Sequence, residues 1–133
     1  MPPAPTAGEG DGEAGIIATQ LAVLMPALLL LLMLGVQFGL WAHASQLARA
    51  AADEAAFIAA LPESTDTAGR TAALGLLAQA GNLTEATVAI DRSPELIVAT
   101  VSGVAPQVVP GFRWSVQATA ASAPERFIPQ GQR

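Results

Sequence analysis

The strongest constraint in this sequence is a long uncharged stretch near its start. From Ala14 to Ala48 there is no Asp, Glu, Lys or Arg, and the only ionisable side chain is that of His43. As a helix at 1.5 Å per residue, Ile16–Ala42 would be about 40 Å long. A membrane span needs about 20 apolar residues to cross a hydrocarbon core of roughly 30 Å. Because a chain of 133 residues has no core that could enclose such a helix, the sequence predicts a membrane-spanning helix over residues 16–42.

The composition excludes several classes of protein. Charged residues make up only 13% of the chain, against roughly 25% in an average soluble domain. With six basic residues and a net charge of −5, the chain lacks the clustered positive charge that nucleic acid requires. Cysteine, lysine and tyrosine are absent, and no nucleophile–base pair, metal-ligand spacing or phosphate-binding glycine loop is present in the sequence. The sequence therefore predicts a protein that is not an enzyme, binds no cofactor or metal, and does not bind nucleic acid.

Four segments are expected along the chain. Residues 1–15 form a hydrophilic leader rich in Pro, Gly and acidic residues, which is not expected to form a regular helix. The membrane helix over 16–42 continues as a helix extension over 43–61, and residues 62–133 form a small extracytoplasmic domain. That domain begins with a helix over about Thr67–Ala80, capped by Thr65 or Asp66 and ended by Gly81. Its predicted buried stripe consists of Ala73, Leu74, Leu77 and Ala80.

The remainder of the domain alternates with a period of two, which indicates strands. Thr87–Ile90 and Leu96–Val101 flank a proline-containing hairpin connection, and a third strand runs from Arg113 to about Ala120. On this third strand one face carries Trp114, Val116, Ala118 and Ala120. This alternation is typical of an antiparallel sheet with one buried and one solvent-exposed face. The predicted fold class is therefore α+β: a long N-terminal membrane-spanning helix, then a small helix and a three-stranded antiparallel sheet. So small a core is marginal alone, and we expect it to pack on the helix extension or on a partner.

Small and helix-bending residues inside the apolar stretch are candidates for helix packing. Gly35 and Gly39 form a G-x-x-x-G pattern that would let a second helix approach closely, although glycine is also simply common in membrane helices. Their stripe also includes Leu28, Leu32 and Ala42. Pro26 removes a backbone donor and is expected to kink the helix.

Two glutamines and one tryptophan mark the ends of the apolar stretch. Gln20 and Gln37 would lie about 25 Å apart along the axis, one near each membrane face. There each amide could be solvated at the interface or could bond to a neighbouring helix. Trp41 and His43 are expected to act as interface anchors rather than as ligands.

One stretch of the chain is similar to a known family. It reads GIIATQLAVLMPALLLLLMLGVQFGLWAHASQLARAAADEAA from Gly15 onward. This stretch resembles the N-terminus of the TadE-like family, the pilin-like proteins of tight-adherence pilus systems, and the likeness extends over roughly residues 13–128. The positions that fit the family pattern are Gly15, Thr19, Pro26, Gly35, Phe38 and Gly39.

The resemblance implies a site of processing, a location and partners. A prepilin peptidase would cut between Gly15 and Ile16, and the mature protein would be a single-pass protein of a bacterial cell membrane with its C-terminal domain outside. Its partners would be other pilin-like or pilus-assembly membrane proteins, with self-association through the helix.

Two departures from the family pattern affect this interpretation. Gln20 is the fifth residue after the expected cut, where pilins usually carry a Glu that neutralises the amino terminus of the neighbouring subunit within the membrane. Glutamine lacks that charge, which disfavours a major filament subunit. Residues 1–15 also lack the basic side chains that the positive-inside rule expects on the cytoplasmic side.

A second function class remains open from the sequence, namely a signal-anchored or secreted extracytoplasmic binding module with no pilus role. Ala42-His43-Ala44 matches the A-x-A pattern of a signal peptidase site, so that a released chain would begin at Ser45. The apolar stretch is longer than the roughly 7–15 residues of a signal-peptide core, and no basic residue precedes it. Both features favour a retained anchor.

Overall fold

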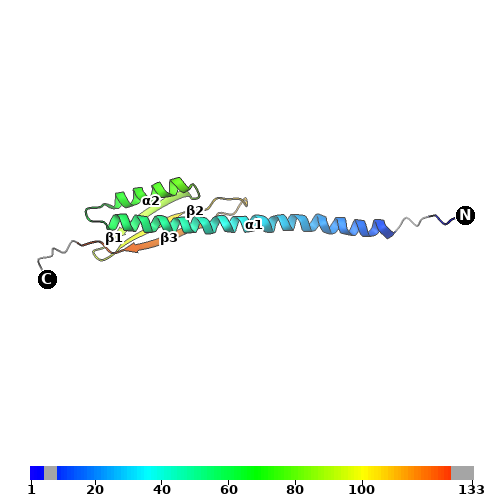
Figure 1. Ribbon diagram of the computed structural model, residues 1–133, viewed down its shortest axis with the longest axis horizontal. Coiled ribbons are helices and arrows are strands. Elements are labelled where there is room, and N and C mark those ends of the chain that lie inside the picture. Colours follow the sequence, from blue (N-terminus) through cyan, green and yellow to red (C-terminus); the bar gives the residue numbers. More distant parts are fainter. Residues whose placement is uncertain (5–8, 127–133) are drawn as a thin grey trace. The chain divides into compact units, whose positions relative to one another are not determined.

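The computed structural model describes residues 1–4 and 9–126, which form two helices and a three-stranded antiparallel sheet (Figure 1). The chain divides into two compact units, Met1–Val36 and Gln37–Arg133. The first helix, α1 (Glu9–Ala60), is long and apolar enough to cross a membrane. The predicted α+β fold, with a long apolar helix, a small helix and three antiparallel strands, is confirmed.

α1 is an unbroken helix of 52 residues that runs through Pro26 and ends at Ala60, shortly before Pro62. The expectation that residues 1–15 form no regular helix is wrong from Glu9 onward. Once the apolar stretch is helical, each added residue gains a backbone hydrogen bond without a new nucleus. Asp11 and Glu13 also lie near the N-terminus of α1, where the helix dipole favours negative charge.

The second helix, α2 (Asp66–Ala80), has a cap at each end. The side-chain oxygen of Thr65 accepts a hydrogen bond from the Ala68 N–H at 3.1 Å. Gly81 has a φ of 65°, a left-handed conformation that glycine adopts without strain, and its N–H donates to the Leu77 carbonyl. Of the two predicted N-cap candidates, Thr65 is the cap and Asp66 is the first helical residue, and the predicted end at Gly81 is confirmed.

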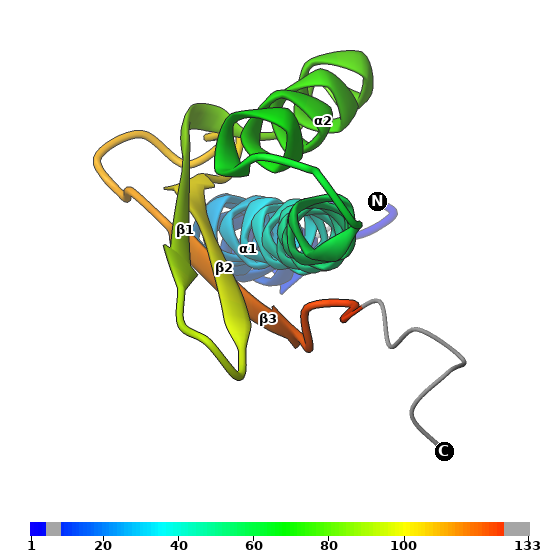
Figure 2. The same cartoon turned by 90° about the vertical axis from the view of Figure 1, so that its left-hand side faces the viewer.

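The sheet has the strand order β1-β2-β3, with every neighbouring pair antiparallel. Its strands are β1 (Thr84–Arg92), β2 (Ile97–Val104) and β3 (Ser115–Ser122), so the three predicted strands exist with shifted ends. The predicted inner face of the third strand is confirmed, because Val116 and Ala120 are buried and Trp114 and Ala118 pack against the core. In Figure 2, α2 lies beside β1, and the helices lie on one side of the sheet.

The core of the second unit is built on an alanine face of α1. Eight alanines of this face are at most 5% exposed: Ala44, Ala48, Ala51, Ala52, Ala55, Ala56, Ala59 and Ala60. The largest cluster of buried residues joins this face to side chains of α2 and of all three strands. Methyl groups project little, so the backbones can approach closely and still exclude water. The sequence predicted that the domain packs on the helix extension or on a partner. The first of these alternatives is observed.

α2 buries a different stripe from the predicted one. Ala73 and Leu77 are buried as expected, but Leu74 is 40% exposed and Ala80 is exposed too. Gly69, which has no side chain to be counted as apolar, occupies the remaining buried position of α2. The prediction failed because apolar periodicity marks side chains, whereas this contact brings backbone against backbone.

Gly69 lies where α2 comes closest to α1. A Cβ atom built at this position would lie 2.6 Å from the Ala55 carbonyl oxygen and 3.1 Å from the Ala59 Cβ. It would also lie 3.1 Å from Cδ1 of Ile90 on β1. Because the nearest of these atoms belongs to a backbone, only the hydrogen of glycine fits without moving α1 and α2 apart.

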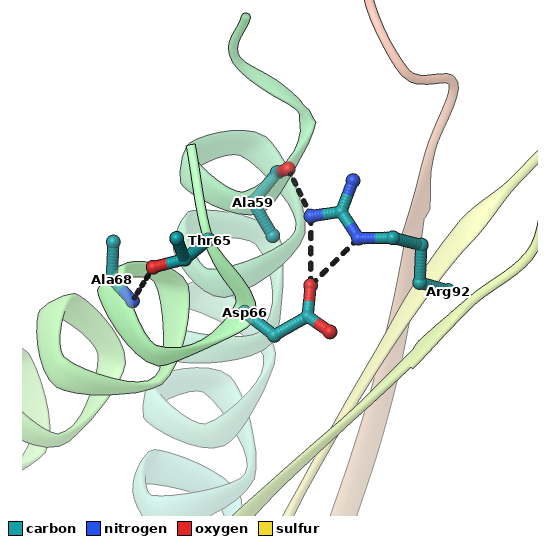
Figure 3. A network of polar contacts seen from close by, with 5 residues as sticks. All are labelled: Ala59, Thr65, Asp66, Ala68 and Arg92. Atoms are coloured by element: carbon teal, nitrogen blue, oxygen red, sulfur yellow. Dashed lines mark hydrogen bonds and ion pairs between the residues drawn. The ribbon is translucent and has the colours of Figure 1, made fainter. Parts of the chain in front are cut away.

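Arg92, the last residue of β1, joins three elements at one end of the domain (Figure 3). Its Nε donates to Oδ1 of Asp66 at 2.8 Å, and its Nη2 donates to the Ala59 carbonyl oxygen at 2.8 Å. Asp66 is the first residue of α2, and Ala59 lies in the last turn of α1. One guanidinium therefore holds the end of α1, the start of α2 and the end of β1 together.

Replacing Gly69 with alanine tests the close approach of α1 and α2. We expect Gly69→Ala to lower the free energy of unfolding by about 1–3 kcal/mol, because the added methyl group would clash with the Ala55 carbonyl. Denaturant unfolding of the full chain in detergent, followed by circular dichroism, measures the change.

Gly75→Ala is the matched control, since Gly75 also lies in α2 but has open space around it. Alanine is the better helix former, so this variant should be more stable than the parent by up to about 1 kcal/mol. Equal stability changes in the two variants would contradict the backbone contact at Gly69.

Candidate membrane anchor and its link to the domain

The apolar side chains of the unit Met1–Val36 are exposed on the surface of α1. Leu28 to Leu32 are each between 56% and 66% exposed, and Ile16, Ile17, Val23 and Leu24 are exposed to a similar extent. An apolar surface this continuous marks contact with a membrane or with another protein. The length and composition of α1 suit a membrane anchor.

Gly15 and Ile16 lie within the helical part of this unit. The Thr19 hydroxyl donates to the Gly15 carbonyl oxygen at 2.9 Å, which adds a side-chain bond to the backbone of the helix. Three glycines occur close together here, at positions 10, 12 and 15. Each weakens a helix by about 1 kcal/mol relative to alanine. The Gly15–Ile16 peptide thus lies in a part of α1 whose residues have low helix propensity.

The other candidate residues of the apolar stretch lie on open surfaces. A Cβ atom added at Gly35 or at Gly39 would meet no atom of the described chain within 4 Å, beyond the helix's own neighbouring backbone. Gln20 is exposed as well. Pro26 lies inside the unbroken α1, and the kink expected there stays a prediction.

Gln37, at the start of the second unit, ties α1 to the loop between β2 and β3. Its side chain is fully buried. Its Nε2 donates to the Pro106 carbonyl oxygen at 3.0 Å, and its Oε1 accepts from the N–H groups of Val108 at 2.7 Å and Val109 at 3.3 Å. One amide therefore satisfies three backbone groups of the β2–β3 loop.

Neither role predicted for Gln37 is correct, since its amide is neither solvated at an interface nor available to a second helix. Its hydrogen-bond partners lie about 70 residues further along the chain, and no pattern of neighbouring residues predicts them. The only available signal was a glutamine in an apolar run, together with a proline-containing loop that has backbone groups to satisfy.

Trp41 makes a second link between α1 and the strands. Its indole N–H donates to the Ser115 carbonyl oxygen at 3.3 Å. The centre of its ring system lies 5.7 Å from that of Phe38 and 6.2 Å from that of Trp114. The turn of α1 from Gln37 to Trp41 is thus joined to the sheet by both polar and aromatic contacts.

Among residues 1–4 and 9–126, no three His, Cys, Asp or Glu side chains lie close enough together to hold a metal ion.

Comparison with known proteins identifies one segment. A family model described as "TadE-like protein" matches residues 15–56. This match confirms the resemblance to the TadE-like family over residues 15–56, and the likeness expected beyond them, up to residue 128, stays a prediction. The matched residues run from Gly15 through the apolar stretch to Ala56 on the alanine face. No curated protein and no solved structure matches the chain.

Replacing Gln37 with leucine tests the link to the loop. Gln37→Leu keeps most of the side-chain volume but removes the acceptor of the Val108 N–H and the donor to Pro106. We expect a loss of about 1–3 kcal/mol in the free energy of unfolding, because partly buried backbone groups lose their partners. Hydrogen exchange read by mass spectrometry should show faster exchange in the peptide that contains Val108.

The control for this change is Gln20→Leu, at an exposed position of the same helix. It should leave both the unfolding free energy and the exchange of the β2–β3 loop unchanged. Slow exchange at Val108 in the Gln37→Leu variant would show that the amide does not hold the loop.

Proposed function

We propose that this chain, whose residues 15–56 match the TadE-like family, is a pilin-related single-pass membrane protein that takes part in assembly of a tight-adherence pilus or a related secretion apparatus. The observation that carries this proposal is that a single helix contains both the apolar stretch and the alanine face of the domain core. The matched segment covers the apolar stretch and six of the eight alanines of this face. Pilin-like architecture of this kind joins membrane anchoring and display of a small domain in one helix.

Processing would occur between Gly15 and Ile16, by a prepilin peptidase. The support for this site is the family match, which begins at Gly15, together with the glycine-weakened start of α1. A protease needs an extended substrate, so this end of α1 would unwind before cleavage. The mature chain would then begin with Ile16, directly at the apolar stretch.

The mature protein would be an assembly component rather than the repeating subunit of a filament. After cleavage Gln20 would be the fifth residue, and its amide carries no charge to neutralise the amino terminus of a neighbouring chain. A charge left unpaired in lipid is costly, which disfavours stacking of many copies in that manner. The C-terminal domain would lie outside the bacterial cell membrane.

Partner helices would pack against the stripe that contains Gly35 and Gly39. The absence of a side chain there lets two backbones approach, which is how membrane helices associate without a hydrophobic driving force. In support, both glycines have open space where a Cβ atom would lie. The partners would be other pilin-like or pilus-assembly membrane proteins, or a second copy of this chain.

The alternative, a secreted module released by cleavage after Ala44, is less well supported. Such a cut would remove Gln37 and Trp41, and with them the hydrogen bonds that these residues make to Pro106, Val108 and Ser115. It would also separate Ala44 from the alanine face to which it belongs. A released domain beginning at Ser45 would lose part of what holds its sheet in place.

Substitution at Gly15 tests the processing step. In cells with an active prepilin peptidase, we expect mass spectrometry to find a chain that starts at Ile16. Gly15→Leu should leave most of the chain uncleaved, because the peptidase recognises the small residue before the cut. The matched control Gly12→Leu, three residues earlier in the same helix, should be cleaved as the parent is. An intact parent chain, or one that starts at Ser45, would contradict the pilin-like route.

Substitution of both Gly35 and Gly39 by leucine tests the packing stripe. The added side chains should hold a second helix away and weaken the signal of a membrane two-hybrid assay. Ala22→Leu introduces the same side chain about 140° around the helix from Gly35, at 100° per residue, and should leave the signal unchanged. Equal signals from the double variant and the parent would rule out this stripe as the contact.

A further inference from the structure

The aromatic side chains of the domain gather at one end. Of the five aromatic residues in the described part of the chain, four lie there: Phe38, Trp41, Phe112 and Trp114. The first two are on α1, and the other two are in the last part of the β2–β3 loop, just before β3. Phe38 is 57% and Phe112 is 61% exposed, and Val108 of the same loop is also exposed. We call Phe38, Trp41, Val108, Phe112 and Trp114 the aromatic end.

The aromatic end lies at the turn of α1 that leads into the apolar stretch. Gln37 holds the β2–β3 loop through the Val108 N–H, and Trp41 holds the start of β3 through the Ser115 carbonyl. The loop is therefore fixed beside Gln37 and Trp41, whatever surrounds the rest of the helix.

Helix length places the start of this turn, at Gln37, at the depth of the lipid headgroups, and its end, at Trp41, just beyond them. Counted from Ile16, about 20 residues at 1.5 Å each cross a hydrocarbon core of roughly 30 Å and reach Gly35. Gln37 and Trp41 then lie about 3 and 9 Å beyond the core. The headgroup layer on each side is about 5–7 Å thick. A loop hydrogen-bonded to Gln37 would lie in that layer.

The composition of the loop suits the same environment. From Val104 to Phe112 there is no charged residue, and Pro106 and Pro110 have no N–H group to satisfy. Gln37 accepts from two of the loop's N–H groups, and Gln107 donates to the Phe112 carbonyl at 2.6 Å. Backbone groups that are satisfied within the protein lower the cost of leaving water. The one charged residue of the loop, Arg113, lies near its end and is paired with exposed Glu85.

We propose, on the premise that α1 is anchored in a membrane as proposed above, that the aromatic end is a second membrane contact. The β2–β3 loop inserts Phe112 and Val108 into the interfacial layer beside Phe38 and Trp41. Aromatic side chains are enriched at this depth because their rings tolerate both lipid and water. This contact fixes the orientation of the domain on the membrane. With a single helix as the only anchor, the domain would be free to rotate about the helix axis.

The absence of cysteine allows a direct test with single labelled sites. The full chain carrying Phe112→Cys, labelled with an environment-sensitive NBD fluorophore, is reconstituted into vesicles of phosphatidylcholine alone. We expect emission at shorter wavelength, several-fold stronger than in water, and quenching by lipids that carry a nitroxide near the headgroup. Val108→Cys is a second site that should behave in the same way.

Matched control sites come from the same domain. Phe57 is 56% exposed and lies on α1 away from the loop, and Leu96 is 42% exposed at the opposite end of the sheet. Labels at Phe57→Cys and Leu96→Cys should report water. Circular dichroism of each labelled chain checks that it is folded. We expect all four labelled chains to fold, because the four substituted side chains are exposed.

A label at Leu30→Cys, within the apolar stretch, separates failure of this proposal from failure of the membrane anchor. If the label at Leu30 reports lipid while those at Phe112 and Val108 resemble the label at Phe57, the anchor stands and the second contact is wrong. If the label at Leu30 also reports water, both are wrong. If the label at Phe112 reports an apolar site that the lipid quencher does not reach and that depends on the ratio of protein to lipid, a second copy covers the loop and the lipid contact is wrong.

Discussion

The alanine face of α1 forms the base on which α2 and the sheet pack. Its methyl groups are almost completely buried against α2 and the sheet, and they leave so little space that Gly69 must be a glycine. A sheet of three short strands could not form an adequate core by itself. The helix that suits a membrane is therefore also the central element of the domain, and the two roles cannot be separated by simple truncation.

Polar side chains hold the two ends of this packing. At one end Arg92 joins α1, α2 and β1, and at the other Gln37 joins α1 to the β2–β3 loop. Both act on backbone carbonyl or N–H groups that apolar side chains could not satisfy. The Gln37 end is also the end at which the aromatic side chains gather. This end of the domain is therefore held by specific hydrogen bonds as well as by apolar packing.

Much of the fold was predictable because its signals are local. Thr65 and Gly81 mark the ends of α2 through their own backbone and side-chain chemistry, and alternation along residues 113–120 identifies the inner face of β3. The two errors have different causes. The early start of α1 at Glu9 depends on propagation from the adjacent apolar stretch. The exposure of Leu74 depends on how closely α2 approaches α1, which no window of neighbouring residues encodes.

Three features could be recognised in the amino-acid sequence: an uncharged run too long for a soluble core of this size, a small α+β domain after it, and a family pattern that begins at Gly15. Periodicity and composition suffice for these features, because they do not depend on contacts between residues remote in sequence. The roles of Gln37 and Gly69, in contrast, became apparent in the folded chain. Their roles arise from groups that are remote in sequence or that belong to another backbone, and such contacts exist only after the chain has packed.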